Sequence, residues 1–219
     1  MSDELLVLGS MATRALLAEL VATWDRPARA LARGGVEAVR RVREGEAVDV
    51  LVLAEAAMRS LEAEGLLLPD SLVPLVASDM AVAVRSGTAL PDLSGPDAPA
   101  RLRAAGRIGY STGPSGDHLL QVLQDWGLRD ALNLVQAPPG IPVGQLLADG
   151  AADLGFQQQS ELISIPGLAI TPIAPPLGKR TLFFGGIPRH SHRPQEAATL
   201  IASFSNSQDA LRRHGLQAA

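Results

Sequence analysis

Residues 34–61, GGVEAVRRVREGEAVDVLVLAEAAMRSL, decide the fold class of this chain. The first part, 36–43, carries apolar residues at helical spacing and predicts a short amphipathic helix. The segment 48–54 follows as a short, mostly apolar run, which predicts a buried strand. A second helix is predicted over 56–64, where Gly65 stops it. A helix, a buried strand and another helix in direct succession are typical of an α/β protein with a parallel sheet.

The same alternation continues on both sides of this stretch, so we expect one α/β architecture for the whole chain. Further strands are predicted at 5–9, 72–84 (with a break near Ser78-Asp79), 107–111, 132–136, 154–157, 169–173 and 181–187. Further helices are predicted at 12–24, 118–126, 144–149, 194–204 and 208–215. A loop rich in glycine and proline, 86–99, is the expected boundary between two lobes.

Composition excludes several classes of partner. Hydrophobic residues make up 47% and charged residues 19% of the chain, as in folded globular proteins. The apolar runs are strand-sized and far shorter than the roughly 20 residues of a membrane span, so no membrane insertion is expected. The net charge of -4 and an aromatic content of 3% argue against a nucleic-acid surface. The absence of cysteine removes disulfides, thiolate catalysis and Cys-ligated metals.

Glycines and small polar residues cluster where predicted strands lead into helices. Four such junctions are 9–13, 34–35, 111–116 and 138–144. In open α/β sheets, ligands bind beyond the carboxyl ends of the strands, where helix N-termini present amide groups. Amides, hydroxyls and the lack of bulky side chains suit an oxyanion or a carboxylate. The alternative is that these residues are ordinary turns and helix caps.

Two titratable side chains stand at predicted strand ends. Glu55 directly follows the strand at 48–54, and His118 comes just after the junction at 111–116. Either group suits a general base, and either suits an ordinary cap or surface position. His190 and His192 form an i,i+2 pair without an acidic neighbour, which we interpret as a solvated surface. Neither a metal nor a cofactor is expected.

Several motifs together resemble the type II periplasmic-binding-protein fold, in its molybdate-binding-protein-like branch. They are the stretch 34–61, LVASDMAVAVRSG (75–87), RIGYSTGPSG (107–116), QAPPGIPVG (136–144) and LGFQQQSEL (154–162). The resemblance covers nearly the whole chain. It implies two α/β lobes joined by two crossing strands, with a ligand cleft between the lobes. Residues 1–80 plus 182–219 would form lobe one, and residues 81–181 lobe two.

The four junctions fall on the family's cleft loops, and the glutamines after the strand at 154–157 are further candidate contacts. The implied ligand-binding residues are Ser10, Met11, Thr13, Gly34, Gly35, Thr112, Ser115, Gly116, Ile141, Pro142, Val143, Gln157 and Gln158. Molybdate binders typically carry a serine in the second loop, where this chain has two glycines, and a tyrosine where Gln158 stands. The loss of two hydroxyls disfavours molybdate, because unpaired ligand oxygens in a dry cleft are costly.

A roomier glycine loop with nearby amide side chains suits a larger organic polycarboxylate. The motifs at 107–116, 136–144 and 154–162 are more similar to the sub-branch that contains aconitate isomerase. His118 departs from this pattern, since an apolar residue or tyrosine is expected there.

Two functions are therefore open. The first is an isomerase of aconitate type, which shifts a proton and a double bond in a small polycarboxylate, with Glu55 or His118 as the base. The second is the solute-binding protein of an ABC importer for a molybdate-like oxyanion or a carboxylate, with an ABC permease as partner. The acidic start, residues 1–4, does not resemble a secretory signal and favours a cytoplasmic location. The alternative is a periplasmic protein whose signal has been removed.

Overall fold

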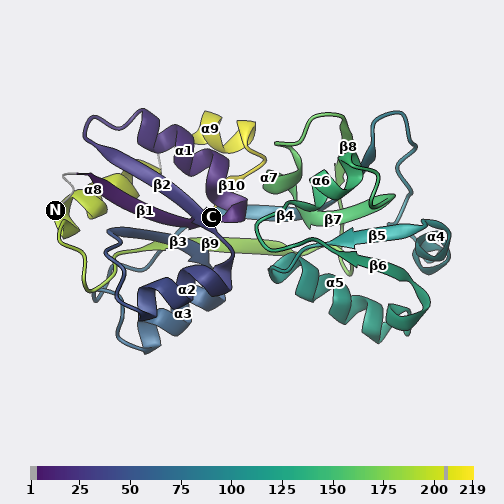
Figure 1. Ribbon diagram of the computed structural model, residues 1–219, viewed down its shortest axis with the longest axis horizontal. Coiled ribbons are helices and arrows are strands. Elements are labelled where there is room, and N and C mark those ends of the chain that lie inside the picture. Colours follow the sequence, from purple (N-terminus) through teal and green to yellow (C-terminus); the bar gives the residue numbers. More distant parts are fainter. Residues whose placement is uncertain (1–3, 205–206) are drawn as a thin grey trace. The chain divides into compact units, whose positions relative to one another are not determined.

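The computed structural model describes residues 4–204 and 207–219. The chain divides into two compact units, residues 1–78 with 181–219 and residues 79–180. It leaves the first unit inside strand β4 (Val73–Arg85) and returns inside strand β9 (Arg180–Gly186), as Figure 1 lets the reader follow. Residues 1–3, part of the acidic start interpreted above, lie outside the described residues. None of the described helices is both long and apolar enough to cross a bilayer.

The first unit is built on three parallel strands. Strand β1 (Leu5–Ser10) lies between β2 (Ala28–Arg33) and β3 (Val50–Ala54). Strand β9 pairs antiparallel with β3, and the first part of β4 pairs with the short strand β10 (Gln217–Ala218). Because β1, β2 and β3 run in the same direction, their carboxyl ends meet at one edge of the sheet.

Helices cover both faces of this sheet, because successive strand residues point to opposite faces. Leu5 and Val7 of β1 belong to one core cluster, and Leu6 and Leu8 belong to a second. The helices of the first cluster are α1 (Arg14–Ala22), α8 (Pro194–Ser203) and α9 (Gln208–Arg213); those of the second are α2 (Gly35–Arg43) and α3 (Glu55–Ala63). Figure 1 shows α1 and α2 on opposite sides of β1.

The second unit repeats this strand order. Strand β5 (Arg107–Tyr110) lies between β6 (Asn133–Gln136) and β7 (Leu154–Gln158), and all three are parallel. The second part of β4 pairs antiparallel with β7 and, along its other side, with β8 (Leu168–Pro172). In both units, therefore, the first of the three parallel strands along the chain lies between the other two.

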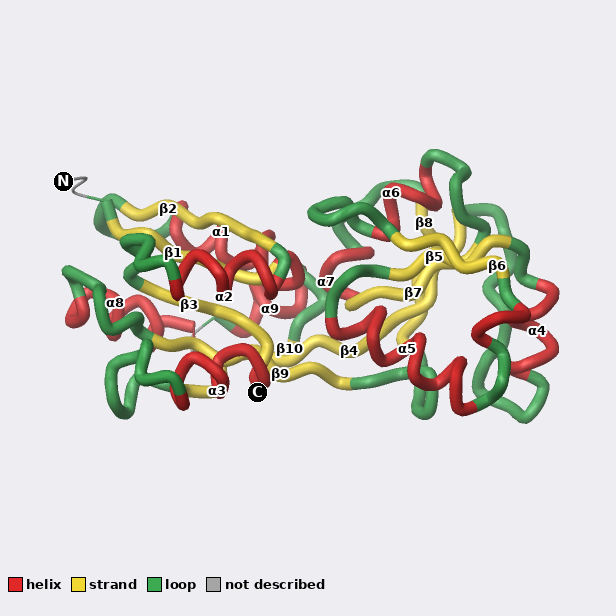
Figure 2. Tube along the Cα trace, turned by 60° about the horizontal axis from the view of Figure 1, so that its bottom comes forward, coloured by secondary structure: helices red, strands yellow, loops and turns green. Residues whose placement is uncertain are grey.

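Helices again lie on both faces of the sheet. Ile108 and Phe156 belong to the core cluster of one face, and Leu147 and Leu162 belong to the other. The first face carries α4 (Ala98–Ala104) and α5 (Pro114–Asp125); the second carries α6 (Val143–Ala148) and α7 (Gln159–Leu162). Figure 2 shows α5 and α6 on opposite sides of β5. The predicted α/β class is confirmed.

Several elements differ from the sequence prediction. Strand β2 is missed, because its residues ARALAR are only half-buried and include no β-branched side chain. The expected break at Ser78-Asp79 is wrong, since β4 runs through both residues as one strand. Helix α5 begins at Pro114 rather than at His118, with proline at the first helical position.

The loop at 86–99 lies inside the second unit, so its interpretation as a lobe boundary is wrong. The chain changes units within two strands, β4 and β9. Strands are built from apolar and β-branched residues, whereas glycine and proline mark turns. Composition therefore gives no signal at this kind of border.

An ion pair joins the start of β5 to the residue before β7. The backbone N and the Nε of Arg107 donate to Asp153 Oδ2 at 2.9 and 3.0 Å, and its Nη2 donates to Oδ1 at 2.9 Å. The side-chain hydrogen bonds from Arg107, helped by its backbone N–H, lower the pKa of Asp153 from 3.8 to about 2. The folded state therefore favours the charged form of this carboxyl group.

We expect this pair to stabilise the fold above the ordinary pKa of the carboxyl group and to lose its effect as the pH falls towards 2. Asp153→Asn should lower the Tm at neutral pH. The Tm difference from wild type should shrink as the pH falls from 4 to 2, because wild-type Asp153 also becomes neutral there. Thermal denaturation followed by circular dichroism measures it, with Asp130→Asn as the control for an exposed acid of the same unit. A Tm difference that stays constant across this range would contradict the assignment.

Candidate ligand-binding site

Parallel strands place the predicted ligand residues of each unit at one sheet edge. In the first unit Ser10 ends β1, Gly34 follows β2 and Glu55 follows β3. In the second unit Ser111 follows β5 and Gln158 ends β7. In each unit the middle strand, β1 or β5, is followed by a helix on one face of the sheet. The two neighbouring strands, β2 and β3 or β6 and β7, are followed by helices on the other face. Such a topological switch point is where open α/β sheets bind ligands.

The loop after β1 is closed by its own hydroxyl groups. Thr13 Oγ1 donates to the carbonyl oxygen of Ser10 at 3.1 Å and lies 3.3 Å from Ser10 Oγ. Thr13 is fully buried, so its hydroxyl shapes the loop rather than facing solvent. Met11 is half-buried, and Ser10 is 9% exposed. These two residues are the accessible part of the loop.

Gly34 and Gly35 leave open space at the carboxyl end of β2. Gly34 is the N-cap of α2 with a φ of -57°, which any residue adopts, and Gly35 has no positive φ either. A Cβ atom built on either glycine would meet nothing within 4 Å. Neither backbone conformation nor packing therefore requires glycine at these two positions, and the space beside them is free for another molecule.

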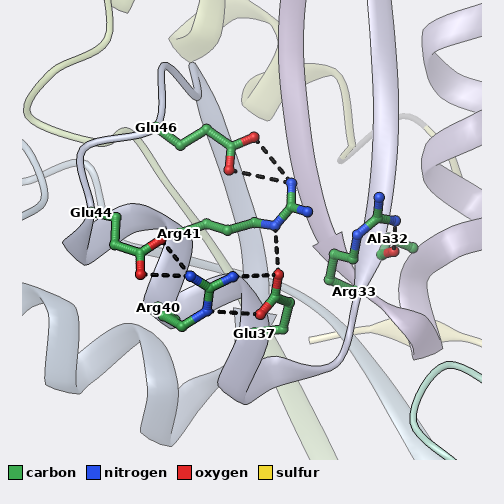
Figure 3. A network of polar contacts seen from close by, with 7 residues as sticks. All are labelled: Ala32, Arg33, Glu37, Arg40, Arg41, Glu44 and Glu46. Carbon is green, nitrogen blue, oxygen red and sulfur yellow. Dashed lines mark hydrogen bonds and ion pairs between the residues drawn. The ribbon is translucent and has the colours of Figure 1, made fainter.

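Ion pairs cover the outer face of α2, as Figure 3 shows. Glu37 accepts hydrogen bonds from Arg41 and Arg40, each at 2.9 Å, and these bonds lower the pKa of Glu37. Arg40 also binds Glu44, and Arg41 also binds Glu46. Glu37, Glu44 and Glu46 are thus engaged with arginines of α2.

Arg33 belongs to the same edge but is not singled out by the sequence. It is the last residue of β2, is half-buried, and pairs in register with Ser10 of β1. Its Nη1 donates to the carbonyl oxygen of Ala32 at 2.7 Å, away from the ion pairs of α2 (Figure 3). Its position directly before Gly34 and Gly35 could have marked Arg33 as a candidate binding residue in the sequence. That inference requires residues 28–33 to be recognised as a strand, because only then does Arg33 stand at a strand end.

The loop after β5 contains a pair of serine hydroxyls. Ser111 Oγ lies 3.0 Å from Ser115 Oγ and accepts a hydrogen bond from Gly113 N at 3.3 Å. Each hydroxyl carries one hydrogen, and one hydrogen bonds the two serines together. The other hydrogen remains for an acceptor outside the pair. Gly116 is needed for this loop, because a Cβ there would lie 1.8 Å from the carbonyl oxygen of Ser111. Thr112, also in this loop, is exposed to solvent.

Gln157 joins three elements of the second unit from a position that is 2% exposed. Its Oε1 accepts from Val143 N at 2.7 Å, and its Nε2 donates to Glu161 Oε2 at 2.6 Å. Both ends of the amide are therefore engaged within the unit. In this arrangement Gln157 and the N–H of Val143 hold α6 and α7 in place, instead of being open to a ligand as the sequence suggested.

The remaining predicted contacts of this edge differ in exposure. Ile141 is 44% exposed, an unusual exposure for a large apolar side chain, and Pro142, the N-cap of α6, is half-buried. Gln158 is 3% exposed. Ile141 and Pro142 are therefore accessible from solvent, whereas Gln158 lies beneath the surface of the unit.

The two candidate bases differ in their partners. Glu55 is the first residue of α3, and Arg59 Nη2 of the same helix lies 3.4 Å from its Oε1. His118 Nε2 lies 2.9 Å from the carbonyl oxygen of Pro176. Since a carbonyl oxygen only accepts, Nε2 carries the hydrogen, which leaves Nδ1 as the basic atom of the neutral ring. Glu55 belongs to the first unit and His118 to the second.

A cavity of about 480 Å³ in the first unit involves the histidine pair. Its lining residues are Gly45, Ala47, Arg189, His190, Ser191 and His192. Residues 45–47 precede β3, so this cavity lies at the edge opposite the loops described above. Within residues 4–204 and 207–219, no three side chains of the metal-ligating types lie close enough to hold an ion.

Comparisons with known proteins agree with this fold. The family model described as bacterial extracellular solute-binding protein matches residues 5–217. A relative from Pseudomonas sp., named aconitate isomerase, is 37% identical over 174 residues. This alignment covers 78% of the chain and 66% of the relative, just under two thirds of its length.

Solved structures extend the likeness in fold. The periplasmic molybdate-binding protein of Azotobacter vinelandii has a TM-score of 0.80 at 19% identity, over 98% of this chain and 99% of the other. A periplasmic binding protein from A. tumefaciens R10 in complex with agropinic acid has a TM-score of 0.71 at 14% identity, over 100% and 83% of the two chains. The predicted type II periplasmic-binding-protein fold is confirmed.

The bonds of Gln157 predict a stability effect. Gln157→Leu should lower the free energy of unfolding by about 1–3 kcal/mol, because it leaves the buried Val143 N–H without its acceptor and Glu161 without one donor. Denaturant titration measures this loss. Gln159→Leu, at a half-buried position of the same triplet, is the control and should change stability much less. Equal losses in the two variants would show that Gln157 does not hold the helices.

The glycines of the two edges should respond differently to alanine. Gly116→Ala should lower the Tm, because its Cβ overlaps the backbone at Ser111. Gly35→Ala should keep the Tm or raise stability by up to about 1 kcal/mol, because alanine fits there and restricts the unfolded chain. Differential scanning calorimetry of both variants tests the contrast. A Gly116→Ala variant as stable as wild type would refute the proposed geometry of the serine loop.

Proposed function

We propose that this chain, which belongs to the family of bacterial extracellular solute-binding proteins, binds a small organic polycarboxylate. We further propose that it isomerises this ligand. The reaction is of the aconitate type, in which a proton and a double bond change position. The observation that carries this proposal is the 37% identity with a relative named aconitate isomerase.

The chemistry of the two edges supports an anionic ligand. The serine loop after β5 keeps a hydroxyl hydrogen for an outside acceptor, and it opens helix α5, whose positive end favours a negative charge. At the end of β1, the Cα of Ser10 is the register partner of Arg33, whose guanidinium uses one donor on the Ala32 carbonyl. Each unit thus offers hydrogen-bond donors that suit carboxylate oxygens.

The space around Gly34 and Gly35 supports an organic ligand over a compact oxyanion. Both glycines are free of contacts on the side where a Cβ would stand. The next residue, Val36, is 86% exposed and offers an apolar surface at the same place. A polycarboxylate has a carbon skeleton to cover such a surface, whereas a tetrahedral oxyanion has only oxygens to present.

The reaction needs one base and a set of donors. The base removes a proton from the carbon next to a carboxylate, the double bond shifts along the skeleton, and a proton returns to another carbon. Hydrogen-bond donors at the carboxylate stabilise the enolate-like charge that develops in between. No atoms are gained or lost, so the reaction requires no second substrate.

We assign the base to His118. Its ring is oriented by the Pro176 carbonyl, and the neutral Nδ1 is available to accept a proton. Glu55 is the second candidate, but its carboxylate is partly neutralised by Arg59 at 3.4 Å.

The alternative function is that of a receptor for an ABC importer. The family description favours it, and so does the likeness in fold to a periplasmic molybdate-binding protein. A receptor would bind the same carboxylate without changing it and would have a permease as its partner. A cytoplasmic location would fit the enzyme and a periplasmic one the receptor, and the location stays a prediction.

Proton exchange separates the two functions. Wild-type protein should exchange the methylene protons of aconitate with heavy water, which proton NMR detects as a loss of signal. His118→Gln should slow this exchange by about 100-fold or more, because general-base catalysis is lost. Its affinity for aconitate, measured by calorimetry, should change only a few-fold. His190→Gln, at the opposite edge of the first unit, is the control and should exchange at the wild-type rate.

The outcomes are distinct. Binding of aconitate without any exchange by the wild type would contradict the enzyme and support the receptor. Full exchange by His118→Gln together with its loss in Glu55→Gln would transfer the role of base to Glu55. Tight binding of molybdate with no response to aconitate or citrate would contradict the ligand class.

A further inference from the structure

We infer that Arg33 binds one carboxylate of the ligand and thereby selects polycarboxylates over acids that lack that group. This inference rests on the proposed function and adds the residue that determines its substrate class. Arg33 ends β2, and its Cα is the register partner of Ser10 at the end of β1. It therefore lies directly at the edge where the first unit presents its hydroxyl and amide groups.

The side chain of Arg33 is on the same face of the sheet as that of Ser10. Residues two apart along a strand point to the same face. Leu8 of β1 and Leu31 of β2 belong to one core cluster, on the side of α2 and α3. Ser10 and Arg33, two residues further along, continue that face beyond the apolar core. An arginine and a serine thus stand side by side where the core ends.

The guanidinium has donors to spare. Its Nη1 donates to the Ala32 carbonyl at 2.7 Å, which orients the group and uses one of its five N–H donors. The planar fork of arginine suits a carboxylate, to which it donates two parallel hydrogen bonds. Arg33 is also half-buried, and a partly desolvated charge attracts an anion more strongly than a fully solvated one.

The acids around Arg33 are already engaged. Glu37, four residues further along the chain, accepts hydrogen bonds from Arg40 and Arg41 (Figure 3). The network on α2 also includes Glu44 and Glu46, which bind the same two arginines. Among the residues that the structure describes, Arg33 forms no ion pair, in contrast to Arg29 at the start of the same strand, which lies 3.1 Å from Glu4.

The space next to Arg33 is open for a ligand of the proposed kind. Gly34 and Gly35 leave it unfilled, and Val36 borders it with an apolar side chain. A ligand with a carboxylate at Arg33 would thus have open space and an exposed apolar residue close by along the chain. The chemical class that fits both features is an aliphatic di- or tricarboxylate.

Calorimetry on Arg33→Met and Arg29→Met tests this inference. The two variants remove the same side chain from the same strand, and Arg29 is the control because it is at the far end and paired. The probes are trans-aconitate, glutaconate, mesaconate and itaconate, the latter three each lacking a different one of the three carboxylates of aconitate. Arg33→Met should bind aconitate about 10- to 100-fold more weakly than wild type, the usual effect of losing a charged hydrogen bond. Arg29→Met should stay within about twofold of wild type.

For one of the truncated acids, wild type and Arg33→Met should bind equally, because that acid lacks the carboxylate that Arg33 holds. Arg33→Lys, which keeps the charge without the fork, should bind aconitate with intermediate affinity. Equal affinities of Arg33→Met and Arg29→Met for aconitate would overturn the inference. So would a uniform loss for all four acids, which indicates a general effect of charge or folding. If the wild type binds none of the acids, the proposed function fails as well, so the two failures are distinguishable.

Discussion

The parallel pairing of a middle strand with its two successors is the constraint on which the rest of this structure depends. Strand β1 between β2 and β3, and β5 between β6 and β7, place three loops at one edge of each sheet. Side chains alternate along these strands, so both faces of each sheet carry a hydrophobic core that helices cover. The helices that follow the strands also begin at that edge. Hydroxyls, amides and the guanidinium of Arg33 collect there as a consequence of topology.

The sequence predicts most of the architecture, because buried strands and amphipathic helices have strong patterns. The prediction fails where an element lacks the sequence pattern that is usual for its structure. Strand β2 is half-buried at the edge of its sheet and has no apolar run, so Arg33 could not be placed at a strand end. The unit borders lie inside strands, where no turn residues mark them. The sequence shows which residues form the loops after the strands. It does not show that Gln157 bonds within its own unit, because that depends on a contact with Val143, fourteen residues earlier.

The two edges combine features that bind an anion with features that hold the loops rigid. Thr13 and Gln157 were expected to contact ligand, yet their polar groups are bonded within their own units. Arg33 and the Ser111–Ser115 pair keep donors that suit an outside acceptor. A receptor and an isomerase on this fold would share such donors. They would differ in whether a base such as His118 reaches a carbon-bound proton, which is a matter of chemistry rather than of fold.

The most direct test of the central claim is a titration of ¹⁵N-labelled protein with aconitate, followed by two-dimensional NMR of the backbone amides. The central claim predicts that the amides of residues 10–13 and 33–36 in the first unit shift, and that those of residues 111–116 in the second unit shift as well. It also predicts that residues 189–192, at the opposite edge of the first unit, do not shift. Shifts confined to residues 189–192, or no shifts at millimolar aconitate, would contradict the claim that these strand edges bind a polycarboxylate.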